Sequence, residues 1–217
     1  MSEQNNTATG SRKYPIITIS REYGAGGRSI AKAVAEQLGI PYYDKDFMKA
    51  TAEQSGYSLE DIEREGEELS RSGKILDNIL NNVTAYTSSH DAIFKAQVQT
   101  ILNLAQNDCI IIGRCANLIL RDAGVPCFDI FLHTDLEHQL ARAKELTDGE
   151  QVDDLKKYVQ NRVARRETYY KTYTNHELGD YHDYDLILDT GVLGYQNCAD
   201  LIVDLVKNKG IRPVHPQ

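Results

Sequence analysis

The segment that most constrains the fold is residues 15–39, which read PIITISREYGAGGRSIAKAVAEQLG. A short β-branched run, Ile16–Ser20, is followed by a cluster of glycines and then by apolar residues at helical spacing. The N–H groups of a glycine loop, together with the N-terminus of a following helix, form a binding site for phosphate. The segment therefore predicts a strand, a phosphate-binding loop and a helix, in that order.

The glycine loop matches a common phosphate-binding template, the P-loop, at most but not all of its positions. Set against G-x-x-x-x-G-K-[ST], the residues from Glu22 to Ser29 place glutamate at the first glycine and Arg28 at the lysine. Arginine keeps the positive charge, and its planar guanidinium binds phosphate oxygens in pairs. Ser29 supplies the hydroxyl that holds Mg²⁺ in the template. The alternative is a flexible turn that only joins a strand to a helix.

The composition argues against several classes of function. The chain has 217 residues and a formal net charge of −8, so we expect neither nucleic acid nor a membrane as a partner. No apolar stretch approaches the length of a membrane span. Residues 1–13 are polar and lack the apolar segment of a secretory signal. We therefore expect a cytoplasmic protein with a disordered leader at residues 1–13, and the oligomeric state stays open.

Short apolar runs along the chain predict a parallel β-sheet. Their continuous apolarity is typical of strands that helices cover on both faces, and helical patterns separate them as an α/β fold requires. A long region without a strand, residues 45–107, lies between the second run and the third. The predicted strands are Ile16–Ser20, Pro41–Tyr43, Cys109–Gly113, Cys127–Leu132 and Leu186–Asp189.

Charged residues follow two of these strands directly. Asp44 comes after Pro41–Tyr43, and Arg114 ends the segment that begins with Cys109. Because α/β folds bind ligands at the carboxyl edge of the sheet, both side chains are candidates for substrate binding. The alternative for Arg114 is a surface residue that caps a strand. Three more arginines occur together in a polar helical stretch, where the alternative is a solvated helix face: Arg162, Arg165 and Arg166.

Four segments together resemble the cytidylate kinase-like family, a branch of the nucleoside monophosphate kinases within the P-loop NTPases. They are ITISREYGAGGRSIAKAVAEQLGIPYYDKDFM, IIIGRCANLIL, FLHTDLEHQLARAKEL and YYKTYTNHELGDYHDYDLILDTGVLG. The resemblance implies an α/β, three-layer P-loop NTPase fold with a five-stranded parallel sheet. It also implies a single kinase-like domain at residues 14–217, with a helical substrate-binding insertion at 45–107 and a lid at 147–182.

The resemblance further implies an activity. A kinase of this kind transfers the γ-phosphoryl group of ATP to a nucleoside monophosphate, here a (d)CMP-like acceptor, with Mg²⁺ as cofactor and Ser29 as its ligand. The residues implied for the ATP phosphates are Gly24, Ala25, Gly26, Gly27, Arg28 and Ser29. Those implied for catalysis are Arg28, Arg162, Arg165 and Arg166. Those implied for the acceptor are Asp44, Lys49 and Arg114.

Departures from the family pattern keep other functions open. Cytidylate kinases have a segment that resembles L-D-[ST]-G-A-x-Y-R, and this chain has Lys49-Ala50 in place of its tyrosine and arginine. In a second segment of the family, G-R-D-I-G, Cys115 replaces the aspartate. The altered segment Asp44–Ala50 favours a P-loop kinase for a different small metabolite. Glu22 and Arg28 favour a non-catalytic, nucleotide-binding regulatory protein. A third alternative is an interaction protein with a vestigial loop.

Overall fold

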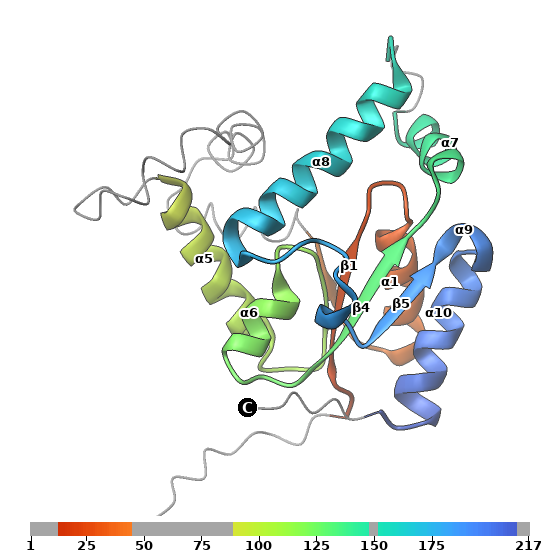
Figure 1. Ribbon diagram of the computed structural model, residues 1–217. Coiled ribbons are helices and arrows are strands. Elements are labelled where there is room, and N and C mark those ends of the chain that lie inside the picture. The colour runs from red at the N-terminus through yellow and green to blue at the C-terminus, as the bar shows by residue number, and fades with distance from the viewer. Residues whose placement is uncertain (1–12, 45–88, 148–151, 212–217) are drawn as a thin grey trace, which may run out of the picture.

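Five parallel strands form the centre of the molecule. The computed structural model describes residues 13–44, 89–147 and 152–211 (Figure 1). The strand order is β2-β3-β1-β4-β5, and each neighbouring pair runs parallel. The predicted strands and their parallel arrangement are thus confirmed. Their bounds are β1 (Ile16–Arg21), β2 (Tyr42–Tyr43), β3 (Ile110–Ile112), β4 (Cys127–His133) and β5 (Leu186–Asp189).

Helices cover both faces of this sheet. The described residues also include a 3₁₀ turn at Tyr181–Asp183 and a π-helical turn at Asp204–Asn208. The helices are α1 (Gly27–Leu38), α5 (Ser89–Leu104), α6 (Ala116–Asp122), α7 (Leu136–Leu146), α8 (Leu155–Thr174), α9 (Thr190–Leu193) and α10 (Tyr195–Val203).

The alternation of side chains along β1 explains the three layers. Ile17 and Ile19 are fully buried in a core that they share with α1 and α10. Ile16 points to the opposite face and packs with α5 and α6, through Ile101 and Leu120. Because helices cover both faces, β1 is buried from Ile16 to Ser20, including its polar residues Thr18 and Ser20. The loop that follows β1 therefore opens at the middle of the sheet's carboxyl edge.

The long helix α8 lies across that carboxyl edge, above the loop that follows β1 (Figure 1). Near its first turns Val159 is fully buried against α7, where it packs with Ala143 and Tyr23. Near its last turn Tyr170 is buried against α6, where it packs with Leu118. The helix is thus attached at both ends and spans the site between them.

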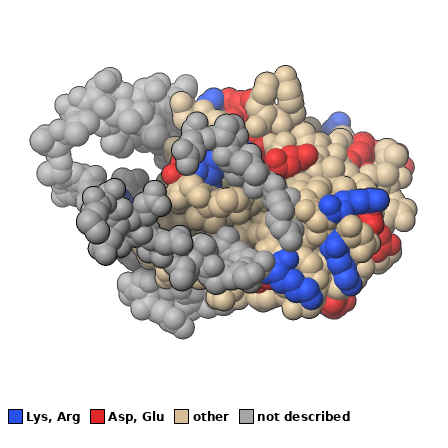
Figure 2. Space-filling model, turned by 90° about the horizontal axis from the view of Figure 1, so that it is seen from below, with Lys and Arg blue, Asp and Glu red and all other residues tan. Residues whose placement is uncertain are grey.

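Several predictions fall on residues outside the described ranges. These are most of the leader, most of the helical insertion at 45–107, and residues 148–151 of the lid. Within the described ranges, none of the helices combines the length and the apolarity needed to span a bilayer. On the face drawn in Figure 2, basic and acidic side chains are interspersed among uncharged ones.

Candidate functional site

A cavity of about 680 Å³ lies at the carboxyl edge of the sheet, between the glycine loop and α8. Its walls come from the loop after β1, the segment after β3, and the helices α7 and α8. Among the described residues its carboxylates are Glu22 and Asp44, and arginines outnumber them. The arginines are Arg21, Arg28, Arg114, Arg142, Arg162, Arg165 and Arg166. Such a lining suits a ligand with several negative charges.

The glycine loop needs glycine at two positions. Gly24 and Gly26 have φ angles of 85° and 71°, a left-handed conformation that side chains rarely adopt. A Cβ on Gly24 would also lie 2.7 Å from the Cα of Gln139 in α7, and one on Gly26 would overlap the ring of Tyr195. The Tyr195 hydroxyl donates to the Gly24 carbonyl oxygen at 3.2 Å. Neighbouring helices therefore hold the loop in shape.

The N-terminus of α1 opens toward the cavity. Gly26 precedes the helix and makes no side-chain cap, and the first turn carries no acidic residue. The N–H groups of this turn are therefore placed for an anion, with the helix dipole in support. Gly24, Gly26, Gly27, Arg28 and Ser29 line the cavity, as predicted residues of the loop. The side chain of Ala25 is instead fully buried in the core with α1.

Arg28 and Asp44, predicted for opposite sides of the site, contact each other. The two side chains form an ion pair across the rim of the cavity. Asp44 is 13% exposed, whereas Arg28 is 61% exposed. The structure thus places Asp44 beside the loop, where it neutralises the arginine that the sequence assigned to catalysis. Lys49, predicted with Asp44 for the acceptor, lies outside the described residues.

Arg21 is a cavity residue that the sequence interpretation missed. It is the last residue of β1, and its side chain packs against Gly27 and Gly113. Burial and the positive charges of Arg166 and Arg114 lower the pKa of Arg21 well below its usual value, although the charge of Asp44 opposes this. The signal that identified Arg114, a charge directly after a buried apolar run, applies equally to Arg21.

The segment after β3 has an unusual backbone. Gly113, Arg114 and Cys115 have φ angles of 71°, 58° and 57°, so three consecutive residues are left-handed. This conformation costs about 1–2 kcal/mol at each residue with a side chain, and such strain is concentrated at functional sites. It directs Arg114 into the cavity, where its guanidinium carbon lies 5.1 Å from the centre of the Tyr169 ring.

The three predicted arginines of α8 all line the same cavity. Arg162 donates to the Tyr158 hydroxyl at 3.1 Å and covers that ring. Arg166 donates to the carbonyl oxygen of Arg21 at 3.3 Å. Burial lowers the pKa of Arg166 to about 10, so its guanidinium is charged at neutral pH. These arginines thus face a cavity instead of forming only a solvated surface.

Two further side chains position the loop. Nη2 of Arg142, on α7, lies 3.4 Å from the Oγ of Ser29. Glu22 accepts hydrogen bonds from the Thr134 N–H at 3.3 Å and from the Gln139 amide at 3.0 Å. No group of three or more His, Cys, Asp or Glu residues could hold a metal in the part of the chain that the structure describes. The Ser29 hydroxyl is a hard oxygen ligand and fits Mg²⁺ that arrives with phosphates.

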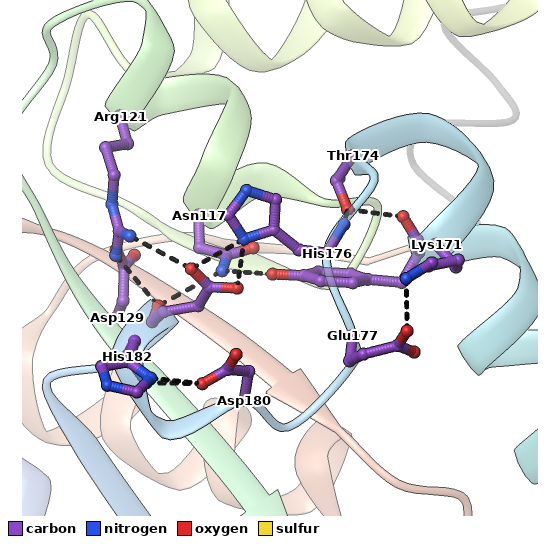
Figure 3. A network of polar contacts seen from close by, with 11 residues as sticks. Asn117, Arg121, Asp129, Lys171, Thr174, His176, Glu177, Asp180 and His182 are labelled. Carbon is purple, nitrogen blue, oxygen red and sulfur yellow. Dashed lines mark hydrogen bonds and ion pairs between the residues drawn. The ribbon is translucent and has the colours of Figure 1, made fainter.

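A buried polar network behind the cavity ties α8 to the sheet (Figure 3). Asn117 on α6 donates to the Tyr170 hydroxyl of α8 at 2.9 Å. Arg121, also on α6, contacts the carboxylates of Asp129 in β4 and of Asp183 before β5. We infer that this network belongs to the scaffold, because of these five polar side chains Tyr170 alone lines the cavity.

Comparisons with known proteins agree with this architecture. The curated cytidylate kinase of Methanocaldococcus jannaschii is 24% identical over 198 residues, which cover 89% of this chain and 98% of that protein. The cytidylate kinase of Methanothrix thermoacetophila is 26% identical over 178 residues, covering 81% and 88%.

Solved structures show the same fold. An uncharacterised protein from Eubacterium ventriosum superposes with a TM-score of 0.57 at 24% identity, covering 88% of this chain and 96% of that one. A shikimate kinase from Bacteroides thetaiotaomicron gives a TM-score of 0.51 at 13% identity, covering 88% and 98%. The α/β P-loop fold is thereby confirmed. A model of the cytidylate kinase-like family matches residues 16–192, and the chain therefore belongs to that family.

Proposed function

We propose that the protein is an ATP-dependent nucleoside monophosphate kinase, which transfers the γ-phosphoryl group of ATP to the phosphate of a (d)CMP-like acceptor. The observation that carries this proposal is the cavity in which arginines from four parts of the chain surround an anion-binding loop. Membership of the cytidylate kinase-like family supports it. The curated relatives are named cytidylate kinases, and these names support a CMP-like acceptor.

The donor phosphates would lie against the loop and the N-terminus of α1. The N–H groups from Gly24 to Ser29 would donate to phosphate oxygens, and the dipole of α1 would favour their charge. Ser29 would hold Mg²⁺, which when bound neutralises part of the phosphate charge. Arg142, next to Ser29, adds a further cation on this side.

The acceptor phosphate would lie on the other side of the cavity, near Arg114. The left-handed backbone holds that guanidinium against Tyr169, so its position is set before the acceptor binds. Asp44 and Lys49 belong to the same proposed acceptor side. A phosphate acceptor is already ionised at neutral pH, so the reaction needs no separate general base.

The arginines of α8 would stabilise the group in transfer. Phosphoryl transfer depends mainly on positioning and on cations that oppose the charge spread over the transferred oxygens. Arg162, Arg165 and Arg166 approach the cavity from above the loop, where they reach both substrates. Because α8 also covers the cavity, it would exclude water and limit hydrolysis of ATP.

A coupled assay of ADP release across nucleoside monophosphates tests this function. We expect turnover with CMP or dCMP in the presence of Mg²⁺. Replacing Arg114 by alanine should raise the KM for the acceptor much more than the KM for ATP. The matched control is Lys32→Ala, because Lys32 is a cation on the outer face of α1, away from the cavity. Absence of turnover with every nucleoside monophosphate would refute the proposal.

A second candidate function is phosphorylation of another small metabolite by the same fold. It is favoured by Asp44, which is paired with Arg28 at the rim and so presents less carboxylate to a nucleotide acceptor. The replacement of the family's tyrosine and arginine by Lys49 and Ala50 also favours it. ADP release with a phosphorylated or acidic metabolite, but with no nucleotide, would identify this function. Binding of ATP without any transfer would instead indicate a regulatory protein.

A further inference from the structure

We infer that Arg21, and not Arg28, is the cation of the phosphate-binding loop, where it replaces the lysine of the P-loop template. The inference deepens the proposed function and rests on it only for the presence of a phosphate-bearing ligand at the loop. It concerns the donor side of the cavity and is independent of the identity of the acceptor.

The backbone indicates which glycine ends the loop. Gly26 is left-handed, with a φ of 71°, and it stands directly before α1. Gly27 is the first helical residue and is not left-handed. In the template the last loop glycine is followed at once by lysine. If Gly26 is that glycine, then Gly27 occupies the lysine position and Arg21 occupies the position of the first glycine.

The two exchanged positions are also neighbours in space. A Cβ on Gly27 would lie 3.1 Å from the Cγ and 3.3 Å from the Cδ of Arg21. The arginine side chain thus passes over the point from which a lysine side chain at position 27 would start. The absence of a side chain on Gly27 makes room for it. One cation is supplied by a different residue of the same loop.

A second glycine determines where the guanidinium ends. A Cβ on Gly113 would overlap the Nη1 of Arg21, so only glycine allows the guanidinium to lie against the end of β3. Arg114 follows immediately. Arg21 therefore reaches from the donor loop to the proposed acceptor segment, which is where a phosphoryl group in transfer would lie.

The surrounding charges fit a cation that awaits an anion. The positive charges of Arg166 and Arg114 act on Arg21 together with burial, and among the described residues the carboxylate of Asp44 counters them. Asp44 is in turn engaged by Arg28. Phosphate oxygens would relieve this repulsion. Arg28 is mostly exposed and forms an ion pair at the rim, so its charge is already solvated and neutralised, and a bound phosphate would stabilise it less.

The test measures ATP affinity by calorimetry on the full chain, without any acceptor. We expect Arg21→Ala to weaken ATP binding by roughly 10- to 100-fold, as expected when a charged hydrogen bond is lost. Arg28→Ala should weaken it by less than about fivefold, because an exposed ion pair contributes little. Lys32→Ala, which removes an exposed cation from the outer side of α1, should leave the affinity unchanged.

A double variant tests the exchange itself. Arg21→Gly combined with Gly27→Lys restores the first glycine and the lysine of the template, with Arg28 left at its serine or threonine position, and we expect it to bind ATP about tenfold more tightly than Arg21→Ala. The melting temperature of ligand-free Arg21→Ala separates binding from folding. It should equal or exceed that of the wild type, because the substitution removes repulsion with Arg114 and Arg166.

The outcomes distinguish the two proposals. An Arg21→Ala protein that is folded and binds ATP as the wild type does would overturn the inference, as would a larger loss in Arg28→Ala. A double variant that binds no better than Arg21→Ala would overturn the exchange of positions. A wild type that binds ATP but phosphorylates no acceptor would refute the proposed function, and the predicted order of ATP affinities would still support the inference.

Discussion

Replacing Arg121 by methionine removes the cation that contacts both Asp129 and Asp183 in the network of Figure 3. Nη2 of Arg121 lies 3.3 Å from Asp129, and Nη1 lies 3.4 Å from Asp183. The side chains of these two aspartates are 0% and 4% exposed, and that of Arg121 is 27% exposed. Methionine keeps most of the volume and no charge, so the change isolates the electrostatic contribution.

The expected loss of unfolding free energy depends on the contacts that the two carboxylates retain without Arg121. Removal of one partner from a buried ion pair costs about 3–5 kcal/mol, because the remaining charge stays buried. Asp129 keeps a hydrogen bond from the Thr18 hydroxyl, and Asp183 keeps its contact with His176. Arg121 is also partly solvated. We therefore expect the lower end of the range, about 3 kcal/mol, which is a large share of the stability of a typical domain.

Urea denaturation at pH 7, followed by circular dichroism, measures this loss. The matched control is Lys171→Met, which removes a cation from the exposed pair with Glu177 and should leave the midpoint unchanged.

A loss of less than about 1 kcal/mol in the free energy of unfolding at pH 7, which is the range of a surface ion pair, would refute this reasoning.

Three further predictions concern the loop, a surface pair and the cavity. Gly24→Ala should lower the free energy of unfolding by about 1–2 kcal/mol, because position 24 has a left-handed backbone. It should also abolish the rise in melting temperature caused by ATP, because a Cβ there meets Gln139. An unchanged ATP response would contradict the loop geometry. The hydrogen bond and the charge of Asp135 raise the pKa of His138. The pair therefore stabilises the fold fully below about pH 6.5, the unfolded pKa of histidine, and this stabilisation is lost as the pH rises through the raised pKa of the folded state. His138→Gln should therefore reduce the dependence of the melting temperature on pH in that window, as measured by thermal shift from acid to mildly alkaline pH. Inorganic phosphate or tripolyphosphate should raise the melting temperature of the wild type, and added NaCl should weaken that effect; no rise at any concentration would argue against an anion site.

The strands were predictable because their signal is local. Helices cover both faces of buried strands such as β1 and β4, so most of their residues are apolar, and the buried polar residues Thr18 and Asp129 are hydrogen-bonded to each other. Even β2, only Tyr42–Tyr43 long, was predicted as a short apolar run at Pro41–Tyr43. The polar helix α8 was predicted as a helix, but its attachment through Val159 and Tyr170 depends on contacts with α7 and α6 that a local pattern does not contain.

The site was predictable only in part, for the same reason. Arg114 and the α8 arginines were found from their place after a strand and from their clustering. Arg21 also follows a buried apolar run, as Arg114 does, but its contact with Gly113, which is distant in sequence and adjacent in space, is absent from any local pattern. The register of the loop is a related case. Gly26 and Gly27 are the same residue type, so the sequence does not show which of them ends the loop. The backbone φ angle distinguishes the residue that ends the loop from the one that begins the helix.

The contact between Tyr195 and the glycine loop has a consequence for the order in which the protein is made. The loop is among the first described segments to leave the ribosome, yet its conformation is held by a ring on α10 and by a hydroxyl that donates to Gly24. The strands beside β1, at Ile110–Ile112 and Cys127–His133, are also made much later. A nascent chain stopped before Tyr195 should thus retain no nucleotide on an affinity resin, although its loop sequence is complete.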